Sequence, residues 1–213
     1  MNKKISLPLS APPGTEPEWP GQFDSWLCRL LPVGLPVYMI TTKNENGTDN
    51  VQLNAWTLLT GRAPAELFLM VLWGGHTLRN ALRTGEWVAN VAPRSMGDRM
   101  FEVVRHNQPE TDELAASGLT ALPGEAVAAS RVAEAVAHFE CRLDWHREIA
   151  PGVALVAGQV VAASADQAIL EGTPEQRVNA LDILFYLPSL FNLASARLDG
   201  ERYASLTPPD AGV

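Results

Sequence analysis

The sequence predicts a mainly β fold, an antiparallel barrel with a few short helices around it. Apolar runs of strand length follow one another closely, at residues 37–40, 51–59 and 67–72. Turn residues connect these runs, and the stretches with helical spacing are short. Many small strands with few helices favour a barrel over a doubly wound sheet.

The first two runs form a predicted hairpin. Residues 37–40 lead into a pair of threonines, and the polar segment that follows contains Asn46-Gly47. This dipeptide readily takes the positive φ angles of a tight hairpin turn. Residues 51–59 are then the predicted return strand.

A short helix is predicted after two glycines at positions 74 and 75. The spacing of Leu78, Ala81 and Leu82 is helical, at i, i+3 and i+4. Thr77 suits the N-cap and Gly85 suits the position that ends the helix. The glycines therefore lead directly into a helix N-terminus.

The N-terminus of this helix has the properties of a phosphate site. Its free backbone N–H groups and the positive end of the helix dipole attract an anion. Thr77 adds a hydroxyl, Arg79 a guanidinium and His76 a ring N–H. The alternative is that the two glycines form only a turn, because the pattern is not G-x-G-x-x-G and no Walker-type lysine follows.

The second half of the chain contains the clearest strand, residues 133–145. Its alternation places Phe139, Cys141 and Trp145 on the core face and polar residues mostly on the other. Residues 153–163 are the predicted antiparallel partner. A short strand is predicted at 168–170.

Two helix starts are predicted in this half as well. Thr173-Pro174-Glu175-Gln176 is a capping box with proline at the first helical position. Ser95 is a predicted N-cap for a helix whose apolar face includes Met96 and Met100.

Length and composition bound the organisation and the environment of the chain. With 213 residues, 46% of them hydrophobic, the sequence predicts one domain at 21–206, an extended arm at 1–20 and a tail at 207–213. A net charge of −8 without a basic stripe argues against nucleic-acid binding, and no apolar run has membrane-spanning length. Cys28 and Cys141 form no disulfide framework, which predicts a cytoplasmic protein.

Other chemistries find little support in the sequence. Metal binding needs clustered ligands, and the histidines are scattered, at positions 76, 106, 138 and 146. A hydrolase is disfavoured because G-x-S-x-G is absent and neither cysteine has a neighbouring histidine. We predict no metal and no residue acting as a general acid or base. An anionic ligand would need local cations, and the arginines near the helix in sequence are Arg79, Arg83, Arg94 and Arg99.

One series of residues resembles the flavin reductase-like family. The series runs through Pro36-Val37, Thr41-Thr42, Gly47, Asn50, Trp56, His76-Thr77, Asn80, Gly85-Glu86-Trp87-Val88 and Asn90. Weaker matches continue downstream to Arg202-Tyr203, so the resemblance covers roughly residues 33–203. It implies a six-stranded antiparallel split barrel of the FMN-binding type, normally a homodimer with FMN at the subunit interface.

The resemblance also implies where FMN would bind. Thr41 and Thr42 would meet the polar edge of the flavin, residues 54–57 would run beside the isoalloxazine, and His76 and Thr77 would hold the phosphate and ribityl chain. Many members have serine where this chain has Ala55, so one flavin hydrogen bond is in doubt. Arg79 is added to the predicted site because of its place in the first turn of the helix. The predicted site then consists of Thr41, Thr42, Asn50, Asn54, Ala55, Trp56, Thr57, His76, Thr77, Arg79, Asn80 and Asn90.

The function implied is that of an FMN-dependent oxidoreductase. It would take electrons from a reduced nicotinamide, NADH or NADPH, and pass them to flavin or another small-molecule acceptor. Two alternatives stay open: an FMN-carrying electron-transfer protein without its own nicotinamide site, and a flavin-free dimeric interaction module. The sequence contains no recognisable nicotinamide motif.

Overall fold

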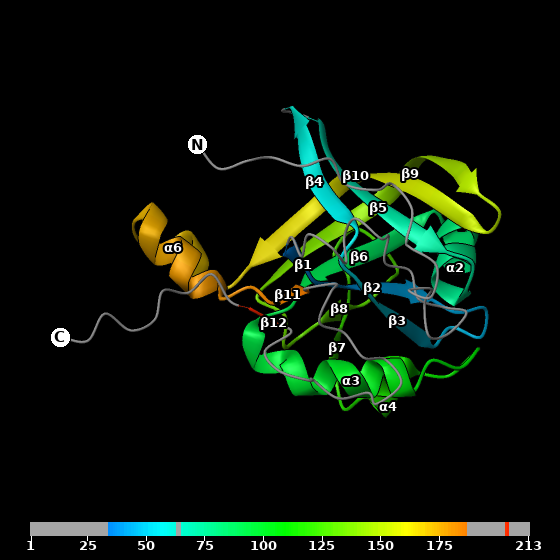
Figure 1. Ribbon diagram of the computed structural model, residues 1–213, viewed down its shortest axis with the longest axis horizontal. Coiled ribbons are helices and arrows are strands. Elements are labelled where there is room, and N and C mark those ends of the chain that lie inside the picture. Colours follow the sequence, from blue (N-terminus) through cyan, green and yellow to red (C-terminus); the bar gives the residue numbers. More distant parts are fainter. Residues whose placement is uncertain (1–33, 63–64, 187–202, 205–213) are drawn as a thin grey trace, which may run out of the picture.

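A seven-stranded antiparallel sheet forms the body of the molecule (Figure 1). This computed structural model describes residues 34–62, 65–186 and 203–204, so the predicted arm, the predicted tail and Cys28 lie outside the described residues. The sheet order is β3-β2-β6-β9-β10-β5-β4. The strands are β2 (Tyr38–Lys43), β3 (Asp49–Asn54), β4 (Thr57–Arg62), β5 (Ala65–Trp73), β6 (Glu86–Val91), β9 (Ala137–Ala150) and β10 (Val153–Ala165).

The two edge strands of this sheet, β3 and β4, are consecutive in the chain. Only Ala55 and Trp56 separate them, so the sheet must curl until its edges meet. The link is attached to β5: the Val71 N–H donates to the Trp56 carbonyl at 2.9 Å, and Asn54 Nδ2 donates to the Val71 carbonyl at 2.9 Å. The predicted antiparallel barrel is confirmed.

The prediction of one return strand over residues 51–59 is wrong. Its first part pairs with β2 and its second part with β5, on opposite edges of the sheet. A single straight strand cannot reach both partners, so the run breaks at the two linking residues. The sheet consequently has seven strands where the resemblance implied six.

Short helices and two small sheets surround the barrel (Figure 1). In the figure, α3 and α4 lie along one side, next to β2 and β3, and α2 lies near the hairpin end of β2. No helix in the described parts of the chain is long and apolar enough to cross a membrane. The helices are α2 (His76–Thr84), the 3₁₀ turn η1 (Arg94–Met96), α3 (Gly97–Arg105), α4 (Glu113–Ala116), α5 (Gln167–Leu170) and α6 (Pro174–Leu181). The small sheets pair β1 (Leu35–Pro36), β11 (Phe185–Tyr186) and β12 (Tyr203–Ala204), and β7 (Ala121–Leu122) with β8 (Arg131–Val132).

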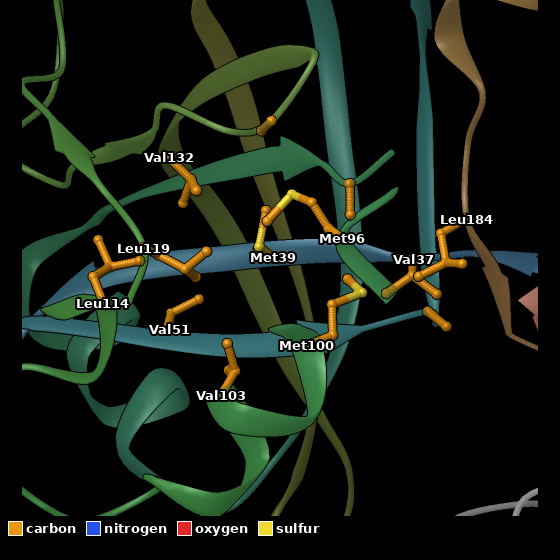
Figure 2. Packing of buried hydrophobic residues seen from close by; sticks show 13 residues of the cluster. Val37, Met39, Val51, Met96, Met100, Val103, Leu114, Leu119, Val132 and Leu184 are labelled. Atoms are coloured by element: carbon orange, nitrogen blue, oxygen red, sulfur yellow. The ribbon is translucent and has the colours of Figure 1, made fainter. Parts of the chain in front are cut away.

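Strand β2 has a hydrophobic cluster on each face. Ile40 belongs to the cluster that includes Phe68 of β5 and Trp87 of β6. Met39 points to the other face, where it packs with residues of β3, α3 and α4 such as Val51 and Leu114 (Figure 2). The alternation of successive side chains therefore ties the barrel to its covering helices through one strand.

Several local predictions are confirmed. The first hairpin turns at Gly47, which has a φ of 85°. Strands β9 and β10 pair antiparallel as expected, although β9 begins at Ala137 rather than at residue 133 and continues to Ala150. The capping box of α6 is present, because Thr173 Oγ1 accepts from the Gln176 N–H at 3.3 Å and Gln176 Oε1 accepts from the Thr173 N–H at 2.8 Å.

Other local predictions are wrong. Thr77 is not the N-cap of α2, which begins at His76 after Gly75. Residues 168–170 belong to helix α5 rather than to a strand. Ser95 lies inside the 3₁₀ turn η1 that precedes α3. Trp145, expected in the core, is 41% exposed because the far end of β9 extends past the covered part of the sheet.

The face of β9 that carries polar residues is also partly buried, although its polar residues made a solvent-exposed face the simpler expectation. His138 and Glu140 are both buried. The Glu140 carboxylate accepts backbone N–H bonds from Glu125, Ala126 and Val127 at 2.6–3.1 Å. A loop folded over this face therefore provides the hydrogen bonds that the buried carboxylate needs.

Close packing around Trp87 predicts the effect of one glycine substitution. A Cβ at Gly158 would lie 2.3 Å from two atoms of the Trp87 ring, which is fully buried. We expect Gly158→Ala to lower the free energy of unfolding by about 1–3 kcal/mol, because the ring has no free space to move into. Urea denaturation measures this change.

Gly97→Ala is the matched control. A Cβ there meets nothing within 4 Å, and its φ of −47° is helical. Its stability should equal or exceed that of the parent. Equal stability of the two variants would contradict the packing of Trp87 against β10.

Candidate functional site

Helix α2 begins without a side-chain cap. Gly75 occupies the N-cap position and carries no side chain, whereas Asp112 caps α4 and Thr173 caps α6. The first N–H groups of a helix have no acceptor within the helix. The N-terminus of α2 therefore presents backbone donors and positive dipole charge, as the spacing predicted.

Four buried polar side chains lie together at α2: Thr77 and Asn80 of the helix itself, Thr42 of β2 and Asn50 of β3. With the N-terminus of α2 they form what we call the α2 group. Asn50 Nδ2 donates to Thr42 Oγ1 at 3.0 Å and to Thr77 Oγ1 at 2.9 Å. Asn80 Nδ2 also reaches Thr42 Oγ1, at 3.3 Å. Both threonine hydroxyls accept, and within the described chain neither donates a hydrogen bond. Their two O–H hydrogens are therefore available to a ligand.

A residue missed by the sequence reasoning, Asn44, holds this cluster to the hairpin. Asn44 Oδ1 accepts from Asn80 Nδ2 at 2.8 Å, and its Nδ2 donates to Thr48 Oγ1 and to the Thr111 carbonyl at 3.0 and 3.1 Å. It lies in the turn segment, where asparagine is common for local reasons alone. The sequence therefore contained no signal for its contact with α2.

The four arginines that are close to α2 in the sequence lie in different places in the structure. Arg94 pairs with Asp182 at 3.5 Å and Arg99 with Glu134 at 3.6 Å, so both charges are neutralised away from α2. Arg83 donates to the Lys43 carbonyl. Arg79 is exposed and forms neither an ion pair nor a side-chain hydrogen bond with any described residue. It is the cation on α2 that a ligand could recruit.

Thr41 and Asn90 lie on the opposite face of the sheet from Thr42. Asn90 Nδ2 donates to the Met39 carbonyl at 2.8 Å, and Asn90 Oδ1 accepts from the Val132 N–H at 2.9 Å. The Thr41 hydroxyl donates to the Ser130 carbonyl. Because neighbouring residues of a strand point to opposite faces, the structure does not bring these two predicted contacts to the α2 group.

The remaining predicted residues form the link between β3 and β4. The Asn54 amide bonds on both sides: its Nδ2 donates to the Val71 carbonyl at 2.9 Å, and its Oδ1 accepts from the Trp56 N–H at 2.8 Å. Ala55 is buried in the core. Trp56 packs edge-on against Trp73, with ring centroids 4.7 Å apart. Thr57 Oγ1 is buried and has no hydrogen-bond partner among the described residues, so it is the unused polar atom of this group.

A buried carboxyl group that the sequence reasoning missed lies next to His76. Glu113 is 1% exposed; its Oε2 accepts from the Val51 N–H at 2.8 Å, and its Oε1 is 3.8 Å from His76 Nδ1. Neither Oε1 nor Nδ1 has a hydrogen-bond partner in the described structure. Burial raises the pKa of Glu113 to about 7. Burial and Arg79 lower the pKa of His76, and Glu110 opposes them.

The α2 group fits a phosphate ester. An uncapped helix end, two unused hydroxyl hydrogens and a free arginine provide donors and positive charge in one place. Thr57 provides an unpaired hydroxyl at the link between the edge strands.

Comparison with known proteins agrees with the resemblance seen in the sequence. A model of the flavin reductase like domain matches residues 31–187. The uncharacterized protein YwrF of Bacillus subtilis (strain 168) is 27% identical over 115 residues, which are 52% of this chain and 56% of that protein. The chain thus spans little more than half the length of this curated relative.

Two solved structures share the fold. Nitrilotriacetate monooxygenase component B from Bacillus cereus has a TM-score of 0.72 and 21% identity, with 98% of each chain covered. Flavoredoxin of Desulfovibrio vulgaris (Miyazaki F) has a TM-score of 0.69 and 20% identity, covering 84% of this chain and 90% of that one.

Burial of Glu113 predicts a pH dependence of stability. Its pKa rises from 4.5 to about 7 in the folded protein, so the folded state holds this proton more tightly than the unfolded chain. Stability should therefore fall as pH rises from about 4.5 through 7 and stay lower above it, by about 3 kcal/mol. Glu113→Gln removes the ionisation, and the variant should gain stability over the parent at pH 8.5 but not at pH 5.

Denaturant unfolding at the two pH values measures this effect. Glu102→Gln, whose side chain on α3 is 40% exposed, is the control and should follow the parent. A Glu113→Gln variant that loses the same stability between pH 5 and 8.5 as the parent would show that Glu113 ionises normally.

Proposed function

Because this chain belongs to the flavin reductase-like domain family, we propose that it binds FMN and acts as a flavin-dependent oxidoreductase. The observation that carries the proposal is the uncapped N-terminus of α2 above two buried threonine hydroxyls with unused hydrogens. This arrangement suits a terminal phosphate, which FMN has and riboflavin lacks.

In this proposal the α2 group holds the phosphate and ribityl chain. The backbone N–H groups at His76 and Thr77, the Thr77 hydroxyl and the Arg79 guanidinium would donate to the phosphate. Asn50 and Asn80 would keep the hydroxyls in place, since their amides already bind them. Bound flavin supplies the electron and hydride chemistry, for which the protein provides position and electrostatics.

The link between β3 and β4 would lie beside the isoalloxazine. Thr57 has the unpaired hydroxyl, and Trp56 has a half-buried ring. Asn54 and Ala55 would shape the link rather than contact the flavin, because the Asn54 amide already bonds to Val71 and Trp56 and the alanine is buried. For the same reason Thr41 and Asn90 would support the site from the opposite face.

We also propose a homodimer. Large apolar side chains are exposed on β4, where Leu58 is 57% and Leu59 40% exposed, and at the far end of β9, where Ile149 is 53% exposed. Such surface is costly to leave in water and suits a second copy of the chain. Sedimentation equilibrium measures the oligomeric state.

The electron donor that we propose is a reduced nicotinamide, with flavin or another small molecule as acceptor. An FMN-carrying electron-transfer protein without a nicotinamide site is the second candidate. Both flavin-binding candidates differ from a flavin-free interaction module, which would leave the polar groups at the N-terminus of α2 without hydrogen-bond partners. We place the protein in the cytoplasm on the cysteine content alone.

Absorption spectroscopy tests flavin binding directly. Protein mixed with FMN and then desalted should keep about one FMN per chain, and steady oxidation of NADH or NADPH should follow when FMN is added. Retained flavin without nicotinamide oxidation would favour the electron-transfer candidate. A colourless protein that does not change the fluorescence of added FMN would contradict the proposed function.

Removal of the free arginine tests the phosphate assignment. Arg79→Gln should weaken FMN binding about tenfold or more, because a charge-assisted contact with phosphate is lost. Riboflavin binding should stay unchanged, since that ligand has no phosphate. Fluorescence titration measures both affinities, and exposed Arg105→Gln is the matched control. An equal loss for FMN and riboflavin would place Arg79 elsewhere in the site.

A further inference from the structure

The α2 end combines an anion site with a buried acid. Glu113 Oε1 and His76 Nδ1 face each other at 3.8 Å, and both are buried without a hydrogen-bond partner among the described residues. An ionised Glu113 would repel a phosphate bound at the N-terminus of α2. A neutral pair leaves two polar atoms unsatisfied, which costs free energy in the ligand-free protein.

The charged groups around the pair are few. His76 is faced by Glu113 from α4, by Arg79 from its own helix and by Glu110 from the segment before α4. Glu110 itself accepts from the Asn46 N–H at 3.0 Å. From the described residues, Glu113 accepts one hydrogen bond, from the Val51 N–H of β3.

Neighbouring ions are paired among themselves. Lys43 binds Asp49 at 2.7 Å on the hairpin. On α3, Arg99 pairs with Glu134 and Arg105 with Glu102. No other described ion pair involves Glu113, so its charge balance depends on His76.

We propose that Glu113 and His76 share one proton, and that a phosphate bound at the N-terminus of α2 draws this proton onto His76. The proton leaves Glu113 Oε1 and binds His76 Nδ1, so a carboxyl and a neutral imidazole become a carboxylate and an imidazolium. The two atoms must approach by about 1 Å to form the hydrogen bond that carries the transfer. Glu113 is then a positioning residue that acts through His76, and this role rests on the proposed FMN site.

The direction of the pH effect follows from the charge of the pair. With its proton the pair is neutral overall; without it, a net negative charge lies beside the phosphate. The raised pKa of Glu113 keeps the proton available near neutral pH. FMN affinity should therefore fall as pH rises above about 7, at most about tenfold per pH unit for one proton.

The ratio of FMN affinity to riboflavin affinity, measured between pH 7 and 9, isolates this effect. The phosphate of FMN is already a dianion in this range, because its second pKa is about 6. We expect the ratio to fall by about tenfold or more across the range. Calorimetry in two buffers of different ionisation enthalpy should show proton uptake with FMN at pH 8 and none with riboflavin.

Glu113→Gln is the decisive variant. Glutamine keeps an acceptor for the Val51 N–H and can donate to neutral His76 Nδ1, but it holds no titrating proton. Its FMN-to-riboflavin ratio should change less than about threefold over the same range. Glu102→Gln on α3 should keep the slope of the parent.

The outcomes separate the two proposals. FMN binding without proton uptake in the parent overturns the shared proton and leaves the function standing. An unchanged slope in Glu113→Gln assigns the proton to another group and also overturns it. Failure to bind either flavin overturns both. If Glu113→Gln does not fold, the calorimetry of the parent still decides.

Discussion

The two-residue link between the edge strands is the constraint on which the rest of the structure depends. Ala55 and Trp56 connect strands at opposite edges of a seven-stranded sheet. The chain can satisfy this only by closing the sheet, and the Asn54 amide fixes the corner to β5. In the closed barrel, α2 covers one end, and α3 and α4 cover one outer face (Figure 1).

This closure explains why polar side chains are buried at the α2 end. Thr42 on β2 and Asn50 on β3 share the face that turns toward α2, and both are buried there with Thr77 and Asn80. Buried amides and hydroxyls need partners, and they find them mostly in one another. The hydrogen atoms that remain unused define the candidate site.

Predictions from sequence succeeded where the cause is local. The Asn46-Gly47 turn and the capping box at Thr173 depend on a few neighbouring residues, and both are present. The split of residues 51–59 depends on which strands lie beside each half, which the run itself does not encode. Glu113 could not be found for the same reason, because its partners come from β3 and α2.

The order of the strands has a consequence for how the protein is made. The hairpins β2–β3 and β4–β5 are local, but they join one sheet only through β6, β9 and β10. The predicted flavin contacts all precede residue 91, yet the barrel that holds them cannot close until β10 has been synthesised through Gln159, the last residue that pairs with β5. The proposed flavin site would therefore be completed only when most of the chain has left the ribosome, and cofactor capture would be a late step of maturation.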